Sequence, residues 1–285
     1  MSGMLYLLTN QNTLHAFEAS TLTQCATRVL HSHTPHLLCC DRALFIGDFK
    51  GCVQRLDPQT LVSQTTAELS NSVSSLFLHS TRFLYVGLMD GSIMGLFPES
   101  LEVLFVFKGF GHKVEAFFES TVGELIIVTD DGLIRSIDSI EGHEISCCPA
   151  HYHTPISDCC VDSEGFFYTV VNRTLSKYNP DTWTVLDTHT IDRGHYTGLF
   201  STEDKRVWVV HEHGEISQRR TDGFQLVKQL YLPNPEQLFV RPTKEAFLFV
   251  IDSASGLYKI RKNDSVCVNK RALDQGVPVA FELCI

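Results

Sequence analysis

The chain has 285 residues, a hydrophobic fraction of 44% and a formal net charge of −10 with a pI near 5.7. This composition is typical of a globular protein and not of a disordered one, and the acidic balance argues against a dedicated binder of nucleic acid. No apolar run approaches the roughly 20 residues of a membrane helix.

The predicted elements are short apolar runs separated by turn residues, and they come in groups of four that we name a, b, c and d. The first group starts at b, with runs at residues 5–9, 13–17 and 22–30. The second is complete, with runs at 35–40, 43–47, 52–56 and 61–69. Runs of this length without helical periodicity predict an all-β protein.

The same group of four recurs to the end of the chain. The turn between b and c can be aligned at seven positions: Asn12, Gly51, Gly91, Gly132, Arg173, Gly214 and Gly256. The steps between them are 39, 40, 41, 41, 41 and 42 residues. A four-stranded unit that repeats about every 40 residues is typical of a β-propeller blade. The later blades are predicted at about 35–70, 73–108, 113–149, 155–191, 196–232 and 237–271.

The first group lacks run a, and one unassigned run remains at residues 277–285. We therefore expect blade 1 to combine 5–30 with 277–285, so that seven blades close into a ring without an exposed sheet edge. No linker is visible, so residues 1–285 are predicted to form one domain.

The residues also resemble a degenerate WD-repeat propeller. Gly111-His112 and Gly194-His195 match the Gly-His pair of that family, and Asp90 and Asp131 match its turn aspartate. Leu56-Asp57 and Ile137-Asp138 match its Trp-Asp pair with the tryptophan replaced. The resemblance covers the whole chain, although no blade carries every feature. It implies that the b–c turns and d–a loops open onto one face around the central channel.

We interpret that face as a partner-binding surface. The residues before the turns are Asn10, Phe49, Met89, Asp130, Val171, Glu212 and Ala254. Exposed apolar side chains at turn tips mark interaction surfaces, although packing on neighbouring loops would also explain them. With contributions from the d–a loops, the predicted partner-binding residues are Phe49, Met89, Phe110, Lys113, Asp130, Tyr152, Tyr196 and Glu212.

Two segments invite a metal-site interpretation, because residues 31–40 and 151–160 both combine His-x-His with Cys-Cys. Consecutive strand residues point to opposite faces, so each pair could offer one thiolate, and three blades separate the segments. We predict structural histidines and small buried cysteines, and no metal or other cofactor.

No catalytic motif appears, so we predict no enzyme and no catalytic residue. A hydrolase at the channel mouth is the alternative, with candidates His15, His36, His195 and His211. A second alternative is a subunit of a nucleic-acid-processing complex, using the basic pairs Arg219-Arg220, Arg261-Lys262 and Lys270-Arg271. These pairs lack interleaved aromatic residues, which disfavours base stacking.

The leading hypothesis is therefore a non-enzymatic scaffold or adaptor subunit that binds one or more proteins or peptides, and neither membrane nor nucleic acid. We expect it to be monomeric alone and to join a larger complex. Residues 1–8 lack the pattern of a signal peptide. The ten cysteines are then expected to be reduced thiols in the cytoplasm, with the nucleus as the alternative.

Overall fold

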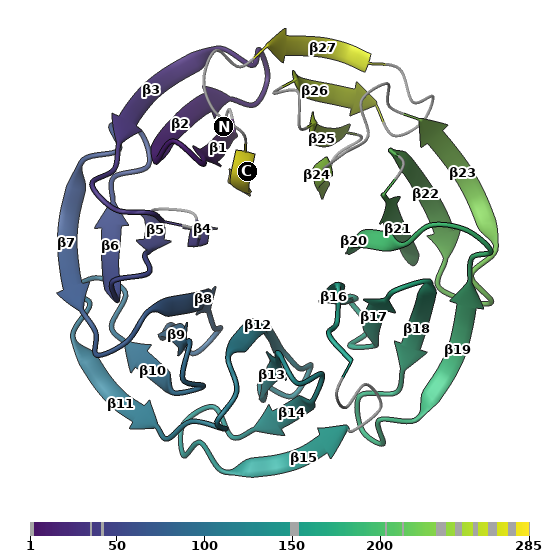
Figure 1. Ribbon diagram of the computed structural model, residues 1–285, viewed down its shortest axis with the longest axis horizontal. Coiled ribbons are helices and arrows are strands. Elements are labelled where there is room, and N and C mark those ends of the chain that lie inside the picture. The colour runs from purple at the N-terminus through teal and green to yellow at the C-terminus, as the bar shows by residue number, and fades with distance from the viewer. Residues whose placement is uncertain are drawn as a thin grey trace.

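The computed structural model is all-β and surrounds a central opening (Figure 1). It describes residues 3–34, 36–40, 43–148, 154–202, 204–212, 214–231, 238–242, 247–252, 256–261, 267–272 and 278–284. Within these residues the strands form seven four-stranded antiparallel sheets. The expected propeller of four-stranded antiparallel blades is confirmed. We number the sheets as blades 1 to 7 in chain order.

The first four blades contain the following strands. Blade 1 has β28 (Pro278–Cys284), β1 (Met4–Thr9), β2 (Thr13–Glu18) and β3 (Gln24–Val29). Blade 2 has β4 (His36–Cys40), β5 (Ala43–Gly47), β6 (Cys52–Leu56) and β7 (Ser63–Glu68). Blade 3 has β8 (Val73–Leu78), β9 (Leu84–Leu88), β10 (Ile93–Leu96) and β11 (Val103–Phe107). Blade 4 has β12 (Val114–Glu119), β13 (Leu125–Thr129), β14 (Ile134–Ile137) and β15 (Glu144–Cys148).

The last three blades follow the same plan. Blade 5 has β16 (Asp158–Val161), β17 (Phe167–Val171), β18 (Thr174–Tyr178) and β19 (Val185–Thr190). Blade 6 has β20 (Tyr196–Thr202), β21 (Arg206–His211), β22 (Glu215–Arg220) and β23 (Leu226–Tyr231). Blade 7 has β24 (Leu238–Pro242), β25 (Phe247–Asp252), β26 (Gly256–Arg261) and β27 (Cys267–Ala272). The predicted limits at residues 35, 149, 232, 237, 277 and 285 lie outside the described residues.

Strand a of each blade lines the central opening and strand d lies on the outer rim (Figure 1). The b strands β5, β9, β13 and β17 are buried at every position. The d strands with described side chains in blades 1 to 6 are instead exposed or partly buried at most positions, as β7 is. Blades that pack face to face bury both faces of their inner strands, which explains why the b runs are continuously apolar.

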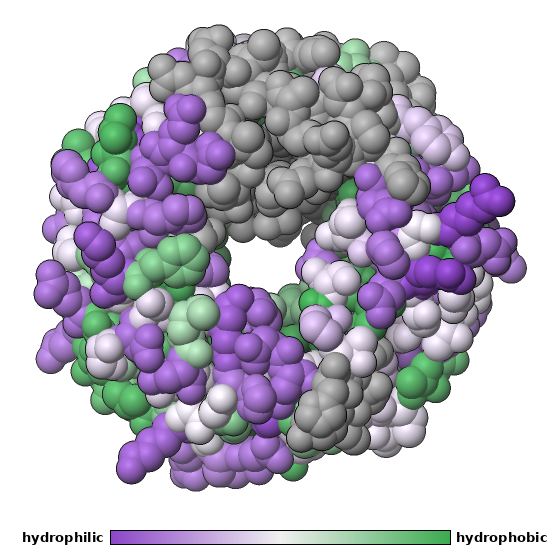
Figure 2. Space-filling view, viewed as in Figure 1, coloured by the Kyte–Doolittle hydropathy of each residue, from purple (hydrophilic) through white to green (hydrophobic). Residues whose placement is uncertain are grey.

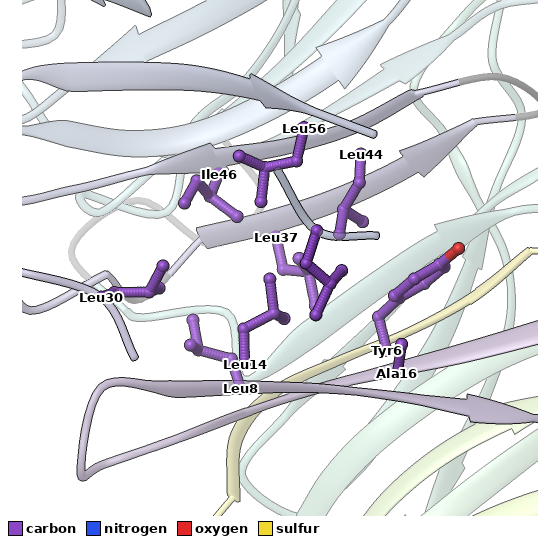
Figure 3. Close-up of a cluster of buried hydrophobic side chains, with 10 residues drawn as sticks. Tyr6, Leu8, Leu14, Ala16, Leu30, Leu37, Leu44, Ile46 and Leu56 are labelled. Carbon is purple, nitrogen blue, oxygen red and sulfur yellow. The ribbon is translucent and has the colours of Figure 1, made fainter. Parts of the chain in front are cut away.

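The hydrophobic cores lie between neighbouring blades. One cluster joins Tyr6, Leu8 and Leu14 of blade 1 to Leu44 and Ile46 of blade 2 (Figure 3). Comparable clusters join blades 2 and 3, 4 and 5, and 5 and 6. The blades are therefore held together chiefly by the burial of aliphatic and aromatic side chains, at about 25 cal/mol per Å² of apolar surface.

The d strands begin about two residues later than the sequence pattern suggests. In blades 1 and 2 the residue expected to begin strand d has a positive φ and ends the c–d turn. These residues are Leu22 (59°) and Leu61 (58°), and Leu101 (58°), Trp183 (53°) and Phe224 (46°) hold the equivalent positions in blades 3, 5 and 6. Leu22, Leu61, Leu101 and Phe224 are each at most 2% exposed. These residues therefore fill the space between blades and take no part in the outer strand.

The two ends of the chain meet in blade 1. Strand β28 pairs with β1 in antiparallel register, with Met4 opposite Cys284 and Leu8 opposite Ala280. The unassigned C-terminal run thus supplies the strand that the first group lacks. In blade 5 the aligned turn is displaced by one residue, because the positive φ of 52° belongs to Asn172 and not to Arg173. No helix long and apolar enough to cross a membrane occurs among the described residues.

Candidate interaction face

The b–c turns and d–a loops are hydrogen-bonded to one another on one face of the propeller. In blades 2, 3, 4 and 6 the residue before the turn donates its backbone N–H to a carbonyl of the adjacent loop: Phe49 to His33 (3.3 Å), Met89 to Ser72 (3.0 Å), Asp130 to Lys113 (3.0 Å) and Glu212 to His195 (3.1 Å). Gly91 shows how closely the segments approach. Its φ is +82°, and a Cβ there would lie 2.4 Å from the His112 carbonyl oxygen. The turn tips are therefore held in a repeated position.

Aspartate side chains accept backbone hydrogen bonds within the b–c turns of blades 2, 3 and 4. The Oδ1 atom of Asp48 accepts the N–H groups of Lys50 (2.9 Å) and Cys52 (2.7 Å). Asp90 and Asp131 accept the N–H group two residues later, at 2.9 and 3.2 Å. These carboxylates satisfy turn donors that would otherwise lack a partner, which is a structural role.

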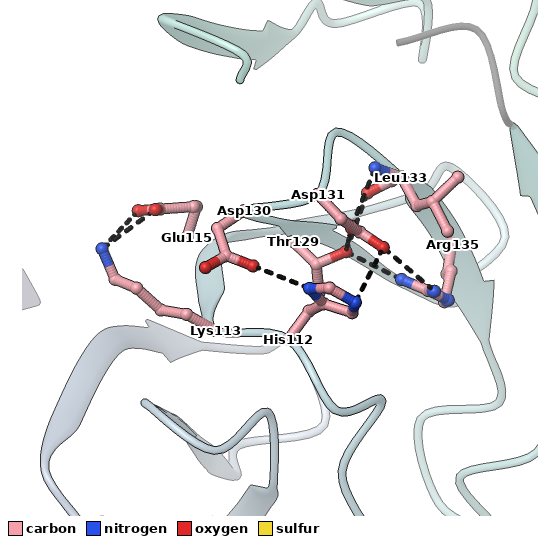
Figure 4. A network of polar contacts seen from close by, with 8 residues as sticks. All are labelled: His112, Lys113, Glu115, Thr129, Asp130, Asp131, Leu133 and Arg135. Carbon is pink, nitrogen blue, oxygen red and sulfur yellow. Dashed lines mark hydrogen bonds and ion pairs between the residues drawn. The ribbon is translucent and has the colours of Figure 1, made fainter. Parts of the chain in front are cut away.

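A polar network in blade 4 joins the residues that carry the WD-repeat resemblance (Figure 4). His112 lies 3.3 Å from Asp130 through Nδ1 and 3.7 Å from Asp131 through Nε2. The Thr129 hydroxyl donates to Asp131 (2.6 Å), and Arg135 donates to Thr129 (2.7 Å). Burial raises the pKa of Asp131, but these hydrogen bonds and the neighbouring charges outweigh it and hold the pKa below its usual value. The network ties the d–a loop to the b–c turn.

Phe49 and Met89 are the exposed apolar tips of this face. Their exposed fractions are 48% and 42%, whereas the b strands behind them are buried. Phe49 packs on the His33 ring at 5.2 Å between centroids, so part of its surface contacts the neighbouring loop. In Figure 2 pale-green apolar surface lies over blades 2 and 3, close to the central opening and bordered by hydrophilic side chains.

Three further predicted residues frame these tips in blade 4. The Asp130 side chain is 43% exposed and the Lys113 side chain 27% exposed. Lys113 bonds both carboxylate oxygens of Glu115, at 2.9 and 2.8 Å. Phe110 is half-buried, with the Arg135 guanidinium 4.8 Å from its ring centroid. Phe110 therefore offers only part of its ring to a partner.

The expectation that Tyr196 lies on the surface is wrong. Its side chain is 1% exposed and packs 4.8 Å from the His211 ring, in the core between blades 5 and 6. The reason is its position, since it is the first residue of β20 and points inward. Glu212 is partly exposed and Val171 is buried. Tyr152 and Ala254 lie outside the described residues.

The four candidate catalytic histidines are not brought together. His15 bonds Thr27 (3.1 Å) and His195 is exposed. Burial and, to a smaller extent, the charge of Lys113 lower the pKa of His36 to about 4. His211 contacts Ser217 (3.1 Å) and Glu215 (3.4 Å), but both through Nε2. A serine–histidine–carboxylate relay uses the two ring nitrogens separately, and Ser217 is fully buried.

The metal interpretation finds no support among the described residues, which contain no group of three or more potential ligands. His151 and His153 lie outside them. The basic-patch interpretation needs one correction, because Arg219 is only 8% exposed and donates to the Phe224 carbonyl (2.9 Å). Arg220 is exposed. Lys262 and the side chains of Arg261, Lys270 and Arg271 are not described.

Sequence reasoning missed Thr129 and Arg135, which complete the network around Asp131. Thr129 lies in β13, two residues before Asp131, and Arg135 lies in β14, four residues after it. The sequence pattern predicts strands at both positions and assigns neither residue a role in the site. The charge of Arg135 in a short strand bounded by Ile134 and Ile137 is the signal that could have identified it, since buried charges are paired.

Comparison with known proteins supports the fold. No protein-family model and no curated protein matches the sequence. Among solved structures, the computationally designed protein Ika8 is 14% identical over 97% of this chain and 86% of that chain, with a TM-score of 0.75. BamB from Moraxella catarrhalis is 13% identical over 96% of this chain and 84% of that chain, with a TM-score of 0.67. At these identities the similarity shows a β-propeller fold and gives no information about function.

Proposed function

We propose that this chain is a non-enzymatic scaffold or adaptor subunit that binds a partner protein or peptide through its b–c/d–a face, over blades 2 to 5. The observation that carries the proposal is the pair Phe49 and Met89. They are 48% and 42% exposed on neighbouring turns that backbone hydrogen bonds hold in place. Large apolar side chains at rigid exposed positions, surrounded by charge, are typical anchors of a protein interface.

The charged residues next to the tips fit a polar rim around an apolar centre. Asp90 follows Met89, and the partly exposed Lys113, Glu115 and Asp130 belong to the next blade. Rim charges of this kind set partner choice and association rate more than affinity. The acidic excess of residues 1–190, with 10 basic and 21 acidic side chains, favours a partner with a basic surface around its apolar contact.

We further propose that the chain is a WD-type propeller and that its seven blades form a closed ring. The network of His112, Thr129 and Asp131 supports a WD-type propeller, and the pairing of β28 with β1 supports a closed ring of seven blades in one domain over residues 1–285. We also propose a cytoplasmic location, on the sequence pattern of residues 1–8 given above. We propose that the chain is monomeric alone and works within a larger complex.

The test begins with affinity capture from the source cells, which identifies the partner. Its dissociation constant is then measured for Phe49→Ala and Met89→Ala. Loss of one apolar anchor costs about 2 kcal/mol, so each variant should bind about 30-fold more weakly. Substitution of exposed residues leaves stability within about 0.5 kcal/mol, so both should unfold at the wild-type temperature.

The matched control is Val62→Ala, which shortens a side chain that is 62% exposed in blade 2 next to the c–d turn, on the opposite face. This variant should bind like the wild type. Unchanged binding by both tip variants, or equal weakening by Val62→Ala, would contradict the proposed face.

A further inference from the structure

A second site lies on the opposite face, where the a–b and c–d turns of blades 4 and 5 meet. A cleft of about 300 Å³ lies there between the a–b turn of blade 4, strands β14 and β15, and the c–d turn of blade 5. This volume is at the lower end of the range for ligand pockets, so it suits one or two side chains or a small molecule.

The cleft lies beside a c–d turn whose last residue differs from those of blades 2 and 3. In blades 2 and 3 the residue that ends the c–d turn is a leucine that is at most 2% exposed, Leu61 or Leu101. In blade 5 the corresponding residue is Trp183, which has the same positive φ but is only partly buried. Phe224 at this position in blade 6 is also buried, so the partial exposure of Trp183 is particular to blade 5, and Trp183 lines the cleft.

Trp183 is held rigidly by both blades. Its ring packs 5.8 Å from Phe167 in an edge-to-face arrangement, and its Nε1–H donates to the Ser146 hydroxyl of blade 4 at 2.9 Å. It also packs against the core cluster that joins the two blades. A fixed aromatic face gives a ligand a preorganised stacking surface, which lowers the entropic cost of binding.

The other lining groups combine negative charge with apolar surface. The cleft is lined by two acidic residues, Glu124 and Asp181, and by no basic residue. Glu124 accepts a hydrogen bond from the Ser136 hydroxyl, and no cation is paired with it among the described residues. Val122 and Ile145, which are 77% and 47% exposed, add apolar surface at the rim.

We propose that this cleft binds an arginine side chain presented by a basic peptide segment of a partner protein. A guanidinium is planar and stacks on an indole, and its five N–H donors match carboxylate and hydroxyl acceptors. The aliphatic part of the side chain packs against Val122 and Ile145. A lysine has no planar group to stack, and an acidic peptide meets like charge.

The two tryptophans of the chain allow a direct test by NMR. Trp208 is fully buried in blade 6, whereas Trp183 lines the cleft, so ¹⁵N-labelled protein has two indole N–H signals with different access to a ligand. The probe is the peptide acetyl-Leu-Arg-Leu-amide, with the citrulline peptide of the same shape as the neutral comparison. The arginine peptide should shift the Trp183 signal alone and bind at least about tenfold more tightly than the citrulline peptide.

Three variants locate the site. Trp183→Leu restores the residue found at this turn in blades 2 and 3, so it should fold, and peptide-observed saturation transfer should show that binding is lost. Glu124→Gln should weaken binding about tenfold, because it removes one charge-assisted contact. Glu99→Gln changes the residue of blade 3 that corresponds to Asp181 and should bind like the wild type, since Glu99 does not line the cleft.

The proposal is overturned if the arginine peptide fails to shift the Trp183 signal up to about 10 mM. Equal binding of the citrulline peptide, or unchanged binding by Glu124→Gln, would also overturn it. The site is independent of the proposed interaction face, so Phe49→Ala should leave the titration unchanged. Each proposal can therefore fail without the other.

Discussion

At the scale of single residues, the pKa of His36 in blade 2 depends in part on the charge of Lys113, which precedes blade 4. His36 lies in β4, which lines the opening, and Lys113 begins the corresponding segment of blade 4. Burial and then the Lys113 charge lower the pKa of His36 to about 4, so the imidazole is neutral at physiological pH. His36 therefore adds no positive charge near Lys113, which pairs with Glu115.

Acidification should destabilise the protein through this histidine. Between the ordinary pKa of 6.5 and the folded value of about 4, the unfolded chain binds more protons at His36 than the folded chain does. The free energy of unfolding therefore falls as the pH is lowered through this window. His36→Asn should lose less stability between pH 7 and pH 5 than the wild type, as measured by urea denaturation at both values.

The pKa of His36 can also be followed directly by NMR. Lys113→Met removes the smaller of the two causes and should raise that pKa above 4 without restoring 6.5, because burial remains. An unchanged pKa in this variant, or equal pH dependence of His36→Asn and the wild type, would contradict the assignment.

At the scale of elements, the sequence predicted the inner strands better than the outer ones. The ranges 43–47 and 52–56 match β5 and β6, because turn residues such as Gly51 and Asp57 bound both runs. The d strands were predicted to start too early, since Leu61 looks like a strand residue although its φ is +58°. A linear pattern cannot show that such a side chain turns back between two blades.

The same limit applies to the candidate site. Phe49 and Met89 could be placed at the turn tips by aligning the repeats, and both are exposed there. Tyr196 was misplaced because a d–a loop and the start of strand a cannot be separated by sequence alone. The cleft beside Trp183 depends on contacts between blades 4 and 5, which a linear sequence pattern does not show.

The role of the c–d turn residue can be tested with two leucines of blade 3. Leu101→Ala opens a cavity between blades, because the side chain is 2% exposed within the core cluster of blades 2 and 3. The expected loss of unfolding free energy is about 2–5 kcal/mol. Leu104→Ala, three residues later on the outer strand, shortens a side chain that is 37% exposed and should cost less than about 1 kcal/mol. Similar losses in urea denaturation would show that Leu101 does not fill the space between blades.

At the scale of the whole molecule, the regular period was enough to predict a β-propeller, and the unassigned C-terminal run was enough to predict a strand that pairs with β1. The partner could not be predicted, because the fold is shared by many proteins and 1764 chains of solved structures match it. What distinguishes this chain is local: apolar tips on one face and an indole at one turn of the other. Both depend on contacts between neighbouring blades.

Closure of that ring can be tested with one new cysteine. Met4 of β1 lies opposite Cys284 of β28 in the antiparallel register. Directly opposed residues of antiparallel strands have Cα atoms about 4.5–5.5 Å apart, which is within the range of about 4.4–6.8 Å for disulfides. Met4→Cys should therefore form a disulfide with Cys284 under mild oxidation, and peptide mapping should identify the linked segments.

The control is Met4→Cys combined with Cys284→Ser, in which the linked peptides should disappear. Cys25 and Cys267 are exposed and provide an internal comparison, since each can be alkylated whether or not the ends meet. If Cys284 of the Met4→Cys variant is alkylated as fast as Cys25, the two ends are not neighbours in one sheet. Blade 1 would then lack its inner strand, and the positions of the tips on blades 2 and 3 would no longer be fixed by a closed ring.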